Sequence, residues 1–194
     1  GIDAGSPYTV FKGIDIKGKT LGIIGFGSIG RRVAKIAHAF GMNVLLYDPF
    51  VSEVDVDEIG QTKVDLPTLL KNSDFVSVHL KVTAETKGLM GKEQFAMMKP
   101  TAYFINTARA AVMDEAALVE AIRNGEIAGA GLDVYAVEPL REDHPFVTEM
   151  ADRVVITPHI CGATTDAIRH HTEMIISDIK RLYNNEPLLY VYRG

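Results

Sequence analysis

The sequence predicts an α/β protein built around a doubly wound parallel sheet of about seven strands. Short apolar segments alternate along the 194-residue chain with longer segments whose apolar residues recur at helical spacing. The apolar segments are continuous runs, which is typical of parallel strands buried on both faces. With 47% hydrophobic and 23% charged residues, the composition suits a globular protein with a core of normal size. We expect one domain over residues 1–194.

The amino-terminal half supplies the first strands and their crossover helices. Gly41 is placed to end the first helix, Asp65 to cap the second, and Pro67 to fit its first turn. The predicted elements are a strand at 20–27, a helix at 28–41, a strand at 43–48, a short strand at 62–64, a helix at 65–73 and a strand at 74–80.

The carboxyl-terminal half continues the alternation. Pro100 ends a short helix, Asp114 caps the next helix and Gly125 stops it. The predicted elements are a helix at 91–99, a strand at 102–107, a helix at 114–125, strands at 127–135 and 153–158, and a long helix at 163–184.

The segment "GFGSIG" contains three glycines in a G-x-G-x-x-G arrangement between the first strand and the helix that follows it. In such a turn Gly25 permits the tight bend, Gly27 lets the backbone approach a pyrophosphate, and Gly30 allows the helix to pack closely on the sheet. The amides at the start of the helix favour an anion. A glycine-rich turn without a ligand is the alternative interpretation.

Asp48 ends the second strand, about 20 positions beyond the glycine segment, where an acidic residue is expected to bind the adenosine ribose hydroxyls. A carboxylate there repels a 2′-phosphate, which favours NAD over NADP. Two alternatives are that Asp48 only starts the turn before Pro49, and that the glycine turn and the acid bind S-adenosylmethionine, as in a methyltransferase.

Further polar residues follow the other predicted strands. Because the carboxyl ends of parallel strands share one edge of a sheet, we expect them to converge on one crevice. His79 could equally be a core histidine, and Glu138 could simply start a turn before Pro139. The residues expected at this edge, besides the glycine segment and Asp48, are His79, Thr107, Arg109, Asp133, Glu138 and His159.

The chemistry of this set points to a hydroxy acid and a nicotinamide. A histidine such as His159 transfers protons near neutral pH, and a neighbouring acid stabilises its charged form. The planar fork of Arg109 matches a carboxylate. With a bound nicotinamide taking the hydride, His159 would take the hydroxyl proton and Arg109 would hold the substrate carboxylate. A structural ion pair is the alternative for Arg109.

Bulk properties exclude several other classes of function. A formal net charge of −5 and a pI near 5.7 argue against sequence-independent binding of nucleic acid, which needs a basic face. The sequence has no apolar run long enough to span a bilayer and no charged-then-apolar leader, so we expect no membrane association. The single cysteine, Cys161, excludes an internal disulfide framework and favours the cytoplasm.

At these residues the chain resembles the D-isomer-specific 2-hydroxyacid dehydrogenases, and nearest their phosphoglycerate dehydrogenase-like branch. The stretches that carry the resemblance are "KTLGIIGFGSIGRRVA", "SDFVSVHLKVTAETKGLMG", "MKPTAYFINTARAAVMDEAAL", "GAGLDVYAVEPL" and "ITPHICGAT". The resemblance implies a Rossmann-type NAD-binding domain, a D-2-hydroxy acid or 2-keto acid as substrate, and a homodimer.

The resemblance also implies individual roles. Arg109 would bind the substrate carboxylate, His159 would act as general acid and base, and Glu138 would pair with His159. Asp133 would meet the nicotinamide carboxamide. The full set expected to contact the cofactor is Gly25, Gly27, Ser28, Ile29, Gly30, Asp48, His79, Thr86, Thr107, Ala108, Asp133, His159 and Gly162. No metal site is expected.

Three departures from the family pattern stand near these residues. Lys81 replaces a common proline, Ala110 and Ala111 replace the glycine common after the arginine, and Cys161 stands where glycine or alanine is usual. Cys161 is either an oxidisable thiol beside the nicotinamide or a small packing residue.

Length is the largest departure. Family members carry a second domain that helps to enclose the substrate, so we expect this chain to be the cofactor-binding domain, with residues 1–17 and 185–194 as remnants of the connections to that domain. An alternative from another class is a non-catalytic, NAD-sensing module that resembles the transcriptional corepressors of this family.

Overall fold

The computed structural model describes residues 5–7, 12–52 and 60–191. The chain divides into two compact units, one ending at Pro158 and one beginning at His159, and each is described by itself. The expectation of a single domain with connecting segments at its two ends stays a prediction.

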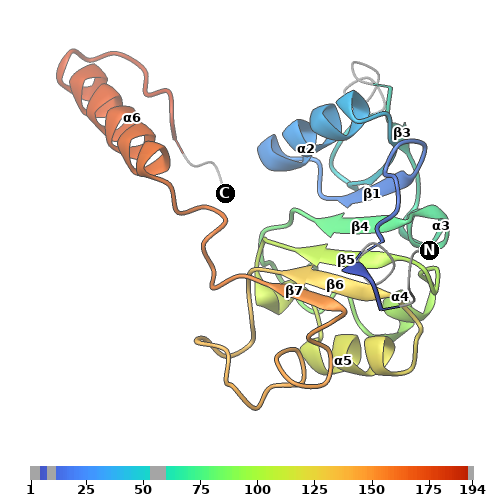
Figure 1. Cartoon of the computed structure of the whole chain (residues 1–194). Helices are drawn as coiled ribbons and strands as arrows, with labels where there is room; N and C mark the ends of the chain where they lie inside the picture. The colour runs from blue at the N-terminus through green and yellow to red at the C-terminus, as the bar shows by residue number, and fades with distance from the viewer. Residues whose placement is uncertain (1–4, 8–11, 53–59, 192–194) are drawn as a thin grey trace. The chain divides into compact units, whose positions relative to one another are not determined.

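The first unit contains a seven-stranded sheet in the order β3-β2-β1-β4-β5-β6-β7, in which every neighbouring pair is parallel. Figure 1 shows β1, β4, β5 and β6 side by side in that order. The strands are β1 (Thr20–Ile24), β2 (Asn43–Tyr47), β3 (Thr62–Lys63), β4 (Phe75–Val78), β5 (Tyr103–Asn106), β6 (Gly129–Leu132) and β7 (Val154–Ile156). The predicted α/β class and its parallel sheet of about seven strands are confirmed.

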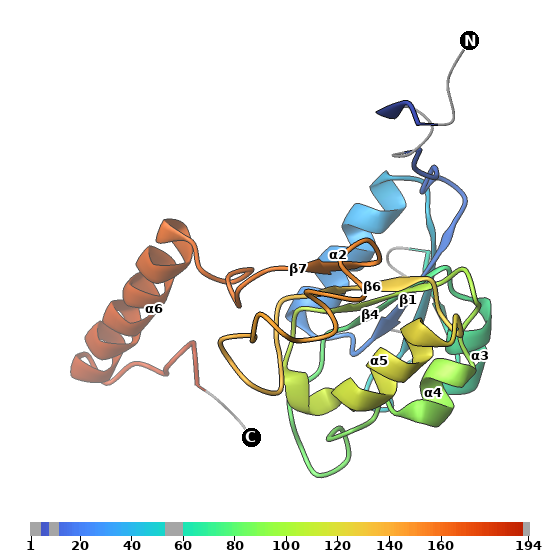
Figure 2. The same ribbon diagram turned by 60° about the horizontal axis from the view of Figure 1, so that its bottom comes forward.

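Helices cover both faces of the sheet. Figure 2 shows α3, α4 and α5 together on one side and α2 on the other. Each side encloses its own cluster of buried apolar side chains, the larger one under α3–α5 and the smaller one under α2. The helices of this unit are α2 (Ser28–Ala39), α3 (Leu66–Asn72), α4 (Lys92–Ala96) and α5 (Glu115–Arg123), with a 3-10 turn η2 at Ala110–Val112. This arrangement confirms the doubly wound fold.

The helix boundaries follow from the residues expected to set them. The Asp65 carboxylate accepts a hydrogen bond from the Thr68 amide at 2.7 Å, and the Asp114 carboxylate accepts one from the Ala117 amide at 3.1 Å. Gly41 and Gly125, just beyond α2 and α5, have φ angles of 73° and 72°, the left-handed conformation that glycine adopts at helix ends.

The strands are shorter than predicted at their carboxyl ends. The prediction extended one strand over 127–135, whereas β6 ends at Leu132. Asp133, Val134 and Tyr135 leave the sheet but stay buried, with at most 6% of each residue exposed. A buried loop has the same apolar sequence pattern as a buried strand, so the pattern could not separate the two.

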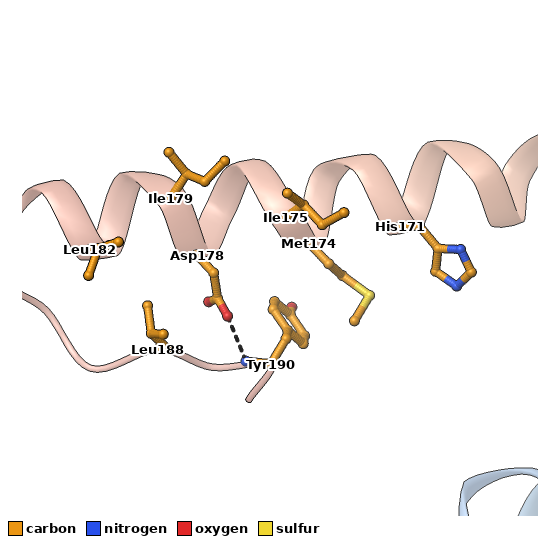
Figure 3. Close-up of a pocket in the computed structure, with 8 residues that line it drawn as sticks. All are labelled: His171, Met174, Ile175, Asp178, Ile179, Leu182, Leu188 and Tyr190. Carbon is orange, nitrogen blue, oxygen red and sulfur yellow. Dashed lines mark hydrogen bonds between the residues drawn. The ribbon is translucent and has the colours of Figure 1, made fainter. Parts of the chain in front are cut away.

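The second unit contains a short segment from His159, then α6 (Thr165–Tyr183) and the segment that returns along it. The amides of Leu189 and Tyr190 donate to the Asp178 carboxylate at 2.9 and 3.0 Å. Figure 3 shows the hollow, of about 390 Å³, that helix and segment form. It is lined by His171, Met174, Ile175, Asp178, Ile179, Leu182, Leu188 and Tyr190. Among the described residues, no helix is both long and apolar enough to cross a membrane.

Candidate active site

Two glycines of the glycine segment are required by packing. Gly25 has φ +94°, and a Cβ atom there would lie 2.7 Å from the carbonyl oxygen of His79. A Cβ atom on Gly30 would lie 2.3 Å from the carbonyl oxygen of Gly25. Real side chains do not reach such distances. Gly25 therefore shapes the turn against β4, and Gly30 brings α2 against the turn, as predicted.

Gly27 differs from these two glycines because it faces open space. It precedes α2 as the N-cap residue, and in the described part of the chain no atom apart from its immediate chain neighbours lies within 4 Å of the position that its Cβ would take. The next two residues, Ser28 and Ile29, are also exposed, Ile29 with 65% of its surface. Packing does not explain a glycine here, whereas a ligand that approaches the backbone does. The amides of the first helical turn suit a pyrophosphate in that space.

Asp48 is bonded to the glycine segment. Its Oδ2 accepts a hydrogen bond from the Phe26 amide at 2.8 Å, and its Oδ1 accepts one from the Phe50 amide at 2.9 Å. The second bond closes the turn before Pro49, so the alternative role of Asp48 is also present. A carboxylate has about four lone-pair sites, and two bonds leave acceptor capacity for ribose hydroxyls.

His79 follows β4 and lies beside the turn at Gly25. Its backbone amide donates to the carbonyl of Ile24 at 2.8 Å, and its ring Nε2 lies 3.1 Å from the Oγ of buried Ser77. Burial lowers the pKa of the His79 imidazole, which favours a neutral ring at pH 7. The ring thus has the surroundings of a core histidine, while the backbone borders the glycine turn.

Thr86 lies in the loop between β4 and α4. Its hydroxyl donates to the carbonyl of Lys81 at 2.6 Å and accepts from the Thr83 amide at 2.8 Å. Backbone hydrogen bonds from Gly88 to Ala111 and from Met90 to Val112 join this loop to the segment that follows Arg109. Thr86 is therefore held in a closed turn that is bonded to the segment following Arg109.

Arg109 is exposed in the loop after β5. Its Nη1 donates to the carbonyl of Ala108 at 2.6 Å. Within the ranges that the structure describes, no carboxylate lies within ion-pair distance of its guanidinium. Neighbouring Thr107 is exposed as well, and Ala108 is half-buried. This geometry does not support the structural ion pair and leaves most of the guanidinium donors for a ligand.

Asn106, which the sequence analysis did not single out, holds this loop. It is fully buried as the last residue of β5. Its Oδ1 accepts from the Ala108 amide at 3.0 Å, and its Nδ2 donates to the Arg109 carbonyl at 3.1 Å. An asparagine at the end of the buried strand, three residues before the arginine, was the available signal.

The loop after β6 carries two acidic residues in different surroundings. Asp133 is buried, and its Oδ1 accepts from the Thr157 hydroxyl at 2.5 Å. Glu138 is exposed, and its Oε1 accepts from the Tyr135 amide at 3.1 Å. A cis peptide bond joins Glu138 to Pro139. Both carboxylates are thus oriented by groups of the same carboxyl edge of the sheet.

Glu115, also missed from the sequence, supports the loop of Glu138. Its Oε2 accepts from the Ala136 amide at 2.9 Å, and its Oε1 lies 3.4 Å from Nε2 of His144. The His144 Nδ1 accepts from the Phe146 amide at 3.2 Å, which leaves the proton on Nε2, toward Glu115. The partner amide is 21 positions away, so no local pattern could reveal this role.

The second unit begins with His159, which is exposed and has φ +54°. Such a conformation is uncommon for residues other than glycine and clusters at functional sites. Cys161 is exposed, and among the residues that the structure describes, apart from the two chain neighbours, no atom lies within 4 Å of where a Cβ on Gly162 would stand. The pairing of His159 with Glu138 and the cofactor contacts of His159 and Gly162 stay predictions.

The first unit brings the other predicted residues into two connected groups. Bonds between Asp48, the glycine turn and His79 form one group, at the ends of β1, β2 and β4. The loops of Arg109 and Asp133 form the other, at the ends of β5 and β6. Since all neighbouring strands are parallel, both groups lie on one edge. The edge can therefore hold an anion at α2 and a carboxylate at Arg109.

Comparison with known proteins identifies the family. Residues 4–161 match the family described as D-isomer specific 2-hydroxyacid dehydrogenase, NAD binding domain. The chain is 46% identical over 178 residues to D-3-phosphoglycerate dehydrogenase of Archaeoglobus fulgidus, which covers 92% of this chain and 33% of that protein. It is 44% identical over 170 residues to glyoxylate reductase of Thermococcus litoralis, which covers 88% of this chain and 50% of that protein.

Among solved structures, D-lactate dehydrogenase with NAD+ from Lactobacillus jensenii superposes with a TM-score of 0.85 at 35% identity. This superposition covers 99% of this chain and 60% of that one. The chain thus spans between 33% and 60% of the length of these three relatives. With the predicted family and fold both confirmed, the chain belongs to the D-isomer specific 2-hydroxyacid dehydrogenases, within their NAD-binding domain.

Proposed function

We propose that the protein to which this chain belongs transfers a hydride between NAD and a D-2-hydroxy acid or its 2-keto acid, and that this chain supplies the cofactor-binding half of the site. The observation that carries the proposal is the exposed guanidinium of Arg109, on the same edge of the sheet as the glycine turn at α2. Such a reaction needs an anion-binding turn for the cofactor and an exposed guanidinium that can bind the substrate carboxylate.

The residues at the glycine turn fit NAD. Gly27 leaves space at the start of α2 for the pyrophosphate, and Asp48 is oriented by the Phe26 amide beside that space. Asp48 accepts hydrogen bonds from ribose hydroxyls, and its charge repels the 2′-phosphate of NADP. Buried Asp133 is proposed to bind the nicotinamide carboxamide. Thr86, Thr107 and Ala108 are proposed to line the cofactor from the two joined loops.

When bound, the nicotinamide supplies the chemistry of hydride transfer. Arg109 holds the substrate carboxylate with two parallel hydrogen bonds and so fixes which carbon faces the ring. His159 is proposed to take the hydroxyl proton during oxidation and to return it during reduction. Glu138 is proposed to pair with His159 and to stabilise its charged form. In these steps the chain itself contributes only the orientation of the substrate and the transfer of a proton.

The partners follow from this reaction. The substrate is a small 2-hydroxy acid, whose identity depends on residues beyond this chain, and a homodimer located in the cytoplasm is part of the proposal. The relatives named above act on phosphoglycerate, glyoxylate and lactate, so the substrate class is shared while the individual acid varies.

The first experiment is a calorimetric titration of this chain with NADH and, separately, with NADPH. We expect micromolar binding of NADH and much weaker binding of NADPH. The full-length protein is then assayed with the D- and L-isomers of several small 2-hydroxy acids, and only D-isomers are expected to reduce NAD. Absence of binding and turnover in the full-length protein would refute the proposal.

A further inference from the structure

Asn106 is a buried polar residue in the middle of the sheet. Its Cα is paired with Val78 of β4 on one side and with Leu132 of β6 on the other, and none of its surface is exposed. An apolar side chain would fill this place without the desolvation cost of a buried amide. Both polar groups of Asn106 are instead directed at one target, the backbone of the loop that carries Arg109.

The two side-chain bonds enclose the backbone of two residues. The Ala108 amide donates to Oδ1 at 3.0 Å, and the Arg109 carbonyl accepts from Nδ2 at 3.1 Å. The φ and ψ angles of Ala108 and Arg109 lie between these anchors. Arg109 has an extended backbone there, with φ −148° and ψ 140°. The Val112 amide is a second donor to the Arg109 carbonyl, at 3.3 Å, but Asn106 is the side chain that holds both ends of this segment. The starting direction of the Arg109 side chain therefore depends on this asparagine.

We infer that Asn106 is a positioning residue for the Arg109 guanidinium. A small rotation of the Arg109 backbone moves the end of so long a side chain by a much larger distance, whereas recognition of a carboxylate tolerates errors of roughly 0.5 Å. The bond from Nη1 to the Ala108 carbonyl adds a second constraint on the same segment. Asn106 acts through Arg109 and contacts no reacting atom.

The backbone of Asn106 extends this role to the cofactor side. Its carbonyl accepts from the Asp133 amide at 3.0 Å. Asn106 is therefore hydrogen-bonded both to the loop of the proposed carboxylate-binding arginine, through its side chain, and to the start of the Asp133 loop, through its backbone. A substitution of the Asn106 side chain leaves the backbone bond to Asp133 in place. It therefore tests the side-chain hydrogen bonds to the Arg109 loop separately.

This inference rests on the proposed function, because it assumes that Arg109 binds the substrate carboxylate. The test uses the full-length enzyme saturated with NAD, with oxalate as a carboxylate probe shaped like a 2-keto acid. Asn106→Asp keeps an acceptor for the Ala108 amide and replaces the donor toward the Arg109 carbonyl by an oxygen. Asn43→Asp is the matched control, since the Asn43 Nδ2 also donates to a backbone carbonyl, that of Gly18, but from the start of β2.

We expect Asn106→Asp to raise the Kd of oxalate about ten-fold and to change the Kd of NADH less than about two-fold. In the background of Arg109→Gln, the same substitution is expected to change the Kd of oxalate less than about two-fold, because the group it positions is gone. Asn43→Asp should leave both constants unchanged. If Asn106→Asp does not fold, Asn106→Ser replaces it in the same cycle.

Two results would overturn the inference. One is an effect of Asn106→Asp that is equally large with and without Arg109, and the other is a loss of NADH binding that matches the loss of oxalate binding; either would assign Asn106 a purely structural role. If Arg109→Gln alone leaves the Kd of oxalate unchanged, the proposed function of Arg109 fails, and the inference that depends on it fails with it.

Discussion

The Phe26 amide, between Gly25 and Gly27 of the glycine segment, donates a hydrogen bond to Oδ2 of Asp48 over 2.8 Å. This single bond joins the turn proposed to hold the pyrophosphate to the carboxylate proposed to select the cofactor. Asp48 therefore has two effects that a substitution can separate: it orders the turn through an oxygen acceptor, and it excludes a 2′-phosphate through its charge.

The first prediction concerns that charge. Asn at position 48 keeps one side-chain oxygen for the Phe26 amide, loses the acceptor for the Phe50 amide, and removes the negative charge. We expect Asp48→Asn to lower the ratio of the Kd for NADPH to the Kd for NADH about ten-fold, which is ~1.4 kcal/mol. Calorimetric titration of both dinucleotides measures the ratio. Asp152→Asn, at an exposed carboxylate, is the control, and an unchanged ratio for Asp48→Asn would remove Asp48 from cofactor selection.

The second prediction contrasts two glycines of one motif. Gly30→Ala places a Cβ atom 2.3 Å from the backbone of Gly25, so we expect a loss of about 1–3 kcal/mol in the free energy of unfolding. The Tm should fall by roughly 2–4 °C per kcal/mol. Gly27→Ala meets open space and has φ −74°, so its Tm should stay within about 2 °C of the parent. Thermal unfolding followed by circular dichroism checks both values.

NADH binding should reveal an effect of Gly27→Ala that thermal unfolding does not. The Cβ of Gly27→Ala enters the space proposed for the pyrophosphate, so its affinity for NADH should fall although its stability does not. Normal NADH binding by Gly27→Ala would show that the cofactor does not approach the backbone there.

The fold could be predicted from the sequence because its determinants are local. Continuous apolar runs predicted six of the seven strands, and the polar β3 was predicted only as a short strand at 62–64. Asp65, Asp114, Gly41 and Gly125 act at the helix ends as their residue types require. The strand ends were placed too far toward the carboxyl edge, because loop residues such as Asp133 are as buried as the strands themselves.

The candidate site could be predicted only in part. Residues with a ligand-binding chemistry, such as Arg109, could be recognised one by one. Residues that position them could not, because Glu115 meets the Ala136 amide 21 positions away and Asn106 shows its role only when its hydrogen bonds are known. A sequence pattern indicates chemistry, whereas support for that chemistry depends on tertiary contacts.

The third prediction concerns the pH dependence of stability. Burial lowers the pKa of His79 in the folded chain, whereas in the unfolded chain His79 has the ordinary histidine pKa of about 6.5. As the pH falls below 6.5, His79 is therefore protonated to a greater extent in the unfolded chain than in the folded chain. The neutral His79 therefore loses part of its contribution to stability as the pH falls below that value. We expect the difference in unfolding free energy between the parent and His79→Gln to be smaller at pH 5.5 than at pH 7.5.

Urea unfolding at the two pH values measures this difference. His170→Gln, at an exposed histidine on α6, is the matched control. A difference between the parent and His79→Gln that does not change with pH would mean that the imidazole is not held neutral by its surroundings.

The last prediction returns to the guanidinium of Arg109. Lysine keeps the positive charge but presents a point donor in place of a planar fork, so it cannot make two parallel hydrogen bonds to one carboxylate. In the full-length enzyme we expect Arg109→Lys to lower kcat/KM for the hydroxy acid about 100-fold, or ~2.7 kcal/mol, with little change in NADH affinity. Arg123→Lys is the control. Arg123 is an exposed arginine at the end of α5, where it pairs with Glu149 and lies outside the loop of Arg109. A kcat/KM that stays at the parent value for every hydroxy acid that the enzyme accepts would show that the carboxylate is held elsewhere.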